Sequence, residues 1–138
     1  MSLPDEILKR ADGWYTVGLL YLTLGIVLVA AGILASTAVS VFTQQLKTNQ
    51  IKILSFIAAV STALAAYFNP IEIGSRFIEA WRLLDSAILH HKTEPAKYDV
   101  STVVAALDKG EDLLSRLPKF AQRTSPAGAA SAAGSAPK

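Results

Sequence analysis

The sequence has no cysteine and few charged residues. The absence of cysteine excludes disulfides, thiolate metal sites and a nucleophilic thiol. Only 17% of the residues are charged while 51% are hydrophobic, and the apolar residues gather in the first half of the chain. This distribution is typical of a membrane protein rather than of a soluble domain with an alternating pattern. The net charge of +2 forms no basic face, so we expect no nucleic-acid partner.

The residue types that carry catalysis or bind ligands are equally scarce. His90 and His91 are the only histidines, and neighbouring residues on a helix point about 100° apart, which makes no shared metal face. We expect this pair to form a solvated helix end. No glycine-rich loop has the spacing of a phosphate site. We therefore predict that the protein is not an enzyme and has no catalytic, metal-binding or cofactor-binding residues and no cofactor.

Two long segments carry no charge. The first, Trp14 to Phe42, would be roughly 44 Å long as one helix, which exceeds the ~30 Å hydrocarbon core of a bilayer. The second, Ile53 to Phe68, is nearer the lower limit for a span. We predict a transmembrane hairpin of these two helices. The alternatives are a signal peptide, for which the apolar run is too long and the lead too acidic, and a soluble bundle with an unusually apolar core.

The flanking charges and rings predict the orientation of this hairpin. Four basic residues flank the two spans on the outer side and two lie between them, so both termini are expected in the cytoplasm and the protein in the cell membrane. The outer residues are Lys9, Arg10, Arg76 and Arg82, and the inner ones are Lys47 and Lys52. Aromatic side chains prefer the headgroup level. We expect four of them at one interface, namely Trp14, Tyr15, Tyr67 and Phe68.

Small residues recur along both spans and are candidates for helix packing. In lipid, close helix contact depends on small residues that let backbones approach. They form the contact between the two helices of the hairpin, or the contact between subunits, or they reflect only the high frequency of small residues in spans. The candidates are Gly18, Gly25, Gly32 and Ser36 on the first span and Ser55, Ala59, Thr62 and Ala66 on the second.

The spans contain hydroxyl groups but no charged side chain. Charges within a membrane usually mark proton relays, ion-coupled transport and voltage sensing, so these mechanisms lose support. A pore lined by hydroxyl groups would need an assembly, because two helices cannot enclose a channel. Hydroxyls in spans more often bond to the backbone of their own helix.

The chain changes character at a membrane-exit junction. Asn69 is a favoured N-cap, Pro70 suits the first helical position and Glu72 completes a capping box. Phe68 and Ile73 occupy the positions of a hydrophobic staple. A new helix is therefore predicted from Pro70 to about residue 90.

This helix carries an apolar stripe, which we call the cytosolic assembly stripe. Its residues are Phe77, Trp81, Leu84 and Ile88, following Ile73 at helical spacing. The stripe packs against the next helix of the chain, against a second copy in a coiled coil, or on the membrane surface.

A second amphipathic helix follows a polar loop. Asp99 or Ser101 is expected to cap it and Pro118 to end it. Gly110 in its middle predicts a close contact or a local bend. The Ala-, Ser-, Gly- and Pro-rich residues after it predict a disordered tail.

The expected fold class is therefore all-α. We expect a cytosolic lead at 1–13, the transmembrane hairpin at 14–68, a cytosolic helical hairpin at 69–118 and the tail at 119–138.

The order of these parts resembles the SLATT superfamily of bacterial two-transmembrane proteins. The likeness covers roughly residues 5 to 118 and includes "RFIEAWRLLDSAI", "ALDKGEDLL" and the dipeptide Gly110-Glu111. The resemblance implies a membrane effector of a bacterial conflict or antiviral defence system that oligomerises into pores or disrupts the membrane. Its implied partners are the lipid bilayer, further copies of the chain, and a separate protein or nucleotide signal. The alternative is a non-conducting structural or accessory membrane subunit that anchors or docks a partner protein.

Overall fold

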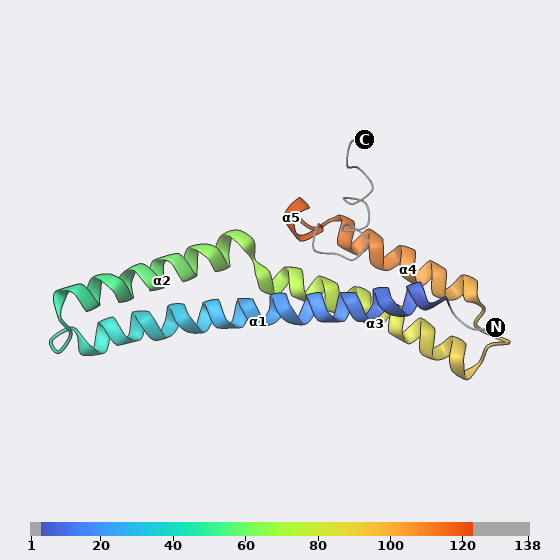
Figure 1. Cartoon of the computed structure of the whole chain (residues 1–138), viewed down its shortest axis with the longest axis horizontal. Coiled ribbons are helices and arrows are strands. Elements are labelled where there is room, and N and C mark those ends of the chain that lie inside the picture. Colours follow the sequence, from blue (N-terminus) through green and yellow to red (C-terminus); the bar gives the residue numbers. More distant parts are fainter. Residues whose placement is uncertain (1–3, 123–138) are drawn as a thin grey trace. The chain divides into compact units, whose positions relative to one another are not determined.

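The described part of the chain is entirely helical. The computed structural model describes residues 4–122, apart from the side chain of residue 120, and contains no strand in that range. The helices are α1 (Asp5–Phe42), α2 (Thr48–Phe68), α3 (Pro70–Thr93), α4 (Val100–Ser115) and the single turn α5 (Lys119–Gln122) (Figure 1). The tail predicted from residue 119 thus begins with a helical turn, and the rest of it lies outside the described residues.

The helices form two compact units, each described here by itself. The bundle unit contains the chain up to Leu20 together with the chain from Ile73 onward. The apolar unit is Tyr21–Glu72. This division differs from the predicted domains, because the N-terminal lead and the first turns of α1 belong with α3 and α4.

Helix α1 begins earlier than the predicted span. It starts at Asp5 and runs for 38 residues without interruption. Asp5 and Glu6 lie in its first turn, where negative charges interact favourably with the helix dipole. Ile7, Ala11 and Trp14 are buried and follow one another at helical spacing. The predicted cytosolic lead is therefore an amphipathic part of the same helix.

The core of the bundle unit is made by the start of α1, by α3 and by α4. Its fully buried large side chains are Trp14, Phe77, Leu84 and Val103. Three residues of the assembly stripe are buried within the chain, namely Phe77, Leu84 and Ile88. Of the three alternatives for this stripe, the structure therefore has packing against other helices of the same chain. Trp81 is half-buried, and its ring lies 4.9 Å from that of Tyr15.

The apolar unit consists of the rest of α1, the whole of α2 and the first residues of α3. A short turn joins α1 to α2, held by the N–H groups of Gln45 and Leu46, which donate to the carbonyl of Phe42 at 2.9 and 3.0 Å. Helix α2 begins at Thr48, so Lys52 lies within the helix and not in the predicted connector. Lys47 precedes it, and its backbone N–H donates to Gln50 Oε1 at 3.0 Å.

Asn69 was predicted as the N-cap of the next helix, and in the structure it also ends α2. Asn69 ends α2 in the left-handed conformation, at φ 40° and ψ 56°, with its N–H donating to the Ala65 carbonyl at 3.1 Å. Asparagine tolerates this conformation better than most residues do. Its side-chain amide donates to the Glu72 carboxylate, and its carbonyl accepts from the Glu72 N–H at 3.1 Å. Pro70 begins α3 as expected, but the helix extends to Thr93.

Candidate membrane surface and helix contacts

The apolar unit exposes large hydrophobic side chains on most of its surface. Both α1 and α2 are long and apolar enough to cross a membrane, and only 17% and 6% of their most apolar windows are buried. A helix in the core of a soluble protein would be mostly buried, and large exposed apolar patches mark interaction or membrane surfaces. The most exposed of these side chains are Leu24, Ile26, Val27, Ile33, Leu34, Val41, Phe42, Ile53, Phe56 and Tyr67.

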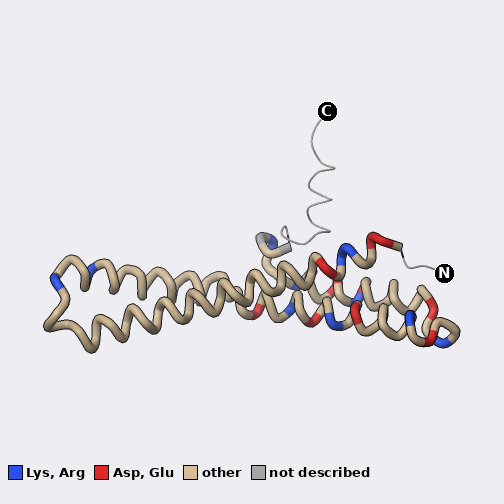
Figure 2. Tube along the Cα trace, turned by 60° about the horizontal axis from the view of Figure 1, so that its bottom comes forward, with Lys and Arg blue, Asp and Glu red and all other residues tan. Residues whose placement is uncertain are grey.

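Charged residues are confined to the ends of this surface. Within Tyr21–Glu72 the charged residues are Lys47 and Lys52 near the turn between the helices and Glu72 at the junction. Figure 2 shows the long uncharged stretch of both helices and the mixed charges of the bundle unit. No charge therefore interrupts the exposed apolar side chains between the turn and the junction.

The three predicted packing glycines of α1 all face another helix of the same chain. A methyl group added at Gly25 would lie 2.5 Å from Ile71 Cγ1 and 3.2 Å from the Ile71 nitrogen. At Gly32 it would meet Thr62 Oγ1 at 3.4 Å, and at Gly18 it would lie 2.9 Å from Ile78 Cδ1. Gly25 thus permits the closest approach, beside the break between α2 and α3.

Helix α2 uses a different face from the predicted one. Ser61 is buried, while Leu54, Ala58 and Ala65 are half-buried. The predicted residues Ser55, Ala59, Thr62 and Ala66 are exposed, and of these Thr62 borders Gly32. The contact face is therefore centred about one residue earlier. Small residues occur on both faces of α2, so their positions alone did not distinguish the two.

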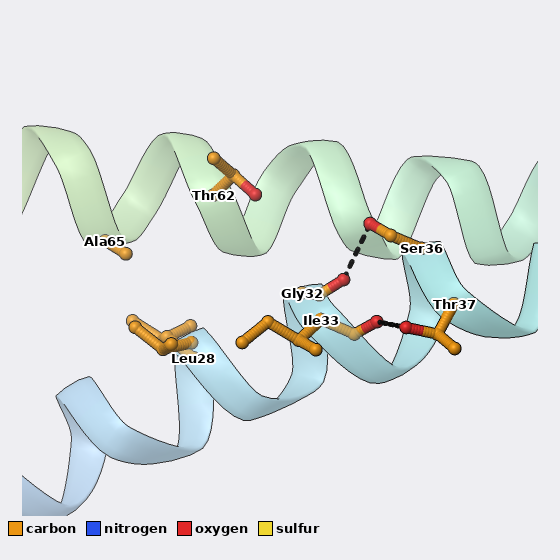
Figure 3. Close-up of a pocket in the computed structure, with 8 residues that line it drawn as sticks. Leu28, Gly32, Ile33, Ser36, Thr37, Thr62 and Ala65 are labelled. Atoms are coloured by element: carbon orange, nitrogen blue, oxygen red, sulfur yellow. Dashed lines mark hydrogen bonds between the residues drawn. The ribbon is translucent and has the colours of Figure 1, made fainter.

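A shallow groove runs between α1 and α2 and has no titratable group. Its hydroxyl groups are all used within their own helices, as predicted for spans. Ser36 donates to the Gly32 carbonyl, Thr37 to the Ile33 carbonyl and Thr62 to the Ala58 carbonyl, each at 2.8 Å. The groove has a volume of about 360 Å³ and is lined by Leu28, Val29, Gly32, Ile33, Ser36, Thr37, Thr62 and Ala65 (Figure 3). Its mostly apolar lining suits an apolar chain.

In the bundle unit, α4 is held against α1 by adjacent residues. A methyl group at Gly110 would lie 2.7 Å from Trp14 Cζ3, which is the close contact predicted there. The next residue, Glu111, forms an ion pair with Arg10. Trp14 is fully buried in this contact, and its place at the headgroup level stays a prediction. The charged residues near Trp14 in the sequence did not indicate that it is buried, because the helix that covers it lies almost a hundred residues later in the chain.

The two histidines hold the loop between α3 and α4. His91 is buried, and its Nδ1 lies 2.7 Å from the carbonyl oxygen of Tyr98. The ring of His90 stacks on that of Tyr98 at 4.9 Å. Asp99 then caps α4, accepting from the Val100 N–H at 2.6 Å. The prediction of a solvated helix end is therefore wrong for His91.

Residues 4–122 contain no group of three or more His, Asp or Glu side chains placed to hold a metal ion. Comparison of the chain with protein-family models, curated proteins and solved structures found no match. The resemblance to the SLATT superfamily therefore stays a prediction from the sequence pattern.

Proposed function

We propose that the chain is an integral membrane protein that assembles with further copies of itself and breaches the bilayer. The observation that carries the proposal is the low burial of the two apolar helices, at 17% and 6% of their most apolar windows. Water would hydrate such a surface at a high cost in free energy, whereas lipid tails solvate it. In this proposal the apolar unit is a transmembrane hairpin, and the bundle unit lies in the cytoplasm with both termini.

The lengths of the helices support this placement. The 21 residues of α2 span roughly 32 Å as a helix, close to the ~30 Å of a hydrocarbon core. Lys47 and Lys52 can extend their ammonium groups to the headgroups from the beginning of α2. The 38 residues of α1 are roughly 57 Å long, so α1 continues well beyond the bilayer.

The assembly is the step that would give the protein its effect. Two helices cannot enclose a channel, so a breach needs several copies. The groove between α1 and α2 and the exposed small residues Ser55, Ala59 and Ala66 leave room for close helix contact between copies. Together with the resemblance described above, this supports an effector of a bacterial conflict or antiviral defence system, triggered by a separate protein or nucleotide signal.

Membrane insertion is tested by a matched pair of variants. Leu34 in the apolar unit is 69% exposed and Leu89 in the bundle unit is 59% exposed. Arginine near the centre of a span costs about 2.5 to 3.5 kcal/mol, so L34R should lower the fraction of chain that resists extraction by alkaline carbonate. L89R should behave like the parent. Equal extraction of both variants would refute the placement of α1 in lipid.

The breach itself is tested in vesicles loaded with a fluorescent dye. Dye release should rise steeply with the protein-to-lipid ratio, and the protein should form a complex of several copies in nanodiscs. A chain that resists carbonate but stays monomeric and releases no dye at any ratio would exclude a pore.

That result would leave the second candidate, a non-conducting structural or accessory subunit that docks a partner protein. The hydroxyl groups of Ser36, Thr37 and Thr62 favour this candidate. Each donates to a carbonyl of its own helix, so none requires water inside the membrane as a hydrogen-bond partner. Unchanged membrane potential over a full range of expression levels would support it.

A further inference from the structure

Helix α4 covers the most deeply buried part of the bundle unit. Beneath it lie Trp14 of α1 and Ala80 of α3, both with no exposed surface. The contact is close because residue 110 is glycine, whose added methyl group would lie 2.7 Å from the Trp14 ring and 3.5 Å from Ala80 Cβ. The Trp14 ring is therefore enclosed only while α4 is in place.

The enclosed Trp14 has an unfavourable feature. Its indole Nε1 is buried and has no hydrogen-bond partner among the described residues. A buried donor without a partner loses its hydrogen bonds to water and gains none in return, which opposes burial. This N–H therefore lowers the stability of the packed core that α4 helps to enclose.

The polar contact beside Trp14 is easily broken. Arg10 and Glu111 join α1 to α4, and their side chains are 37% and 41% exposed. Ion pairs with this exposure are screened by solvent and contribute little. A competing charge can therefore reach the pair without unfolding the bundle.

We propose that α4 is an inhibitory cover whose release allows the chain to assemble. The proposal rests on the proposed function, since it names how assembly in the membrane is regulated. Release of α4 would expose Trp14 together with the buried residues Phe77 and Leu84. We take the same surface of a second copy to cover it, because the cores of interfaces between copies are apolar and rich in aromatic side chains.

Charge reversal tests the cover directly. R10E and E111R each place like charges together, whereas the double variant R10E/E111R restores an opposite pair. Hydrogen exchange of the α4 amides and chemical crosslinking of copies are measured in nanodiscs. Each single variant should raise both readouts about two- to five-fold, in line with the strength of exposed ion pairs, and the double variant should return both to the parent level.

A control within α4 separates release from general weakening of the helix. Arg116 and Asp112 form an ion pair at 2.8 Å that lies on α4 alone. R116E should leave crosslinking at the parent level, because this pair does not join α4 to α1. If R116E raised crosslinking as much as R10E does, release of α4 from α1 would not be the cause.

The remaining outcomes separate this inference from the proposed function. Faster exchange in α4 without more crosslinking would overturn the cover, and so would unchanged exchange in both single variants. Dye release is measured in parallel on the same samples. Increased crosslinking with no dye release would support the cover and refute the breach.

Discussion

Replacement of Gly110 by alanine tests the contact between α4 and α1. The new methyl group would lie 2.7 Å from Cζ3 and 2.9 Å from Cη2 of Trp14. The ring cannot move aside, because it is fully buried. Overpacking of this kind costs about 1 to 3 kcal/mol, while alanine favours a helix over glycine by about 1 kcal/mol. The clash should win, and we expect the bundle unit to lose about 1 kcal/mol of stability.

A double-mutant cycle isolates the contact from the other effects. W14F removes the outer ring atoms that the methyl group would meet, although it lowers stability by leaving a cavity. On this background G110A should be neutral or should stabilise by up to about 1 kcal/mol, through helix propensity alone. The coupling between the two substitutions should therefore be about 1 to 2 kcal/mol.

The assay is unfolding in a mild detergent, followed by circular dichroism and by tryptophan fluorescence, which in W14F comes from Trp81 alone. G32A serves as a control, because its methyl group would meet the nearest atom at 3.4 Å, an ordinary contact. It should leave stability unchanged or raise it by up to about 1 kcal/mol, through helix propensity alone. A G110A protein as stable as the parent, or a coupling within about 0.5 kcal/mol of zero, would refute the reasoning.

Three further substitutions test other contacts. H91A should weaken the loop between α3 and α4 by about 1 kcal/mol, because the Tyr98 carbonyl loses its partner, and limited proteolysis should then cut residues 94–99 faster. N69G should be tolerated at φ 40° while N69V should cost about 1 to 2 kcal/mol in thermal unfolding, and equal effects would argue against the left-handed conformation. G25L should disturb the contact with Ile71 and increase hydrogen exchange at the end of α2, whereas unchanged exchange would contradict the close approach.

Local patterns predicted the helices well, because each rests on signals between residues near in sequence. The uncharged runs predicted two long apolar helices and Pro70 the start of α3. For the cap of α4, Asp99 was one of two candidates beside Ser101. The features that were not predicted depend on partners elsewhere in the chain. Trp14 is buried by α4, which lies far away in the sequence. The buried His91 lies next to a backbone carbonyl, and because every residue has a carbonyl, the sequence does not indicate which one would be its partner.

The face of α2 that is buried within the chain could not be chosen from the sequence, for a different reason. Its small residues surround the helix, so several faces satisfy the same spacing rule, and only the structure shows that Ser61 is the buried one. The α1 stripe at Ile7 and Ala11 was readable, but the charges between these residues suggested a solvated lead. The composition of the sequence was therefore sufficient to predict the apolar unit. The bundle unit could not be predicted in this way, because it is formed by contacts between residues far apart in the chain.

The ion pair between Arg10 and Glu111 joins residues 101 positions apart, which has a consequence for biosynthesis. At about 5 to 20 residues per second, a ribosome needs roughly 5 to 20 s to make the intervening chain. During that interval the nascent N-terminus presents Ile7, Ala11 and Trp14 without the helix that later encloses them. The apolar unit is translated before the bundle can close, and α4 is made after α1 and α3, the two helices that it packs against.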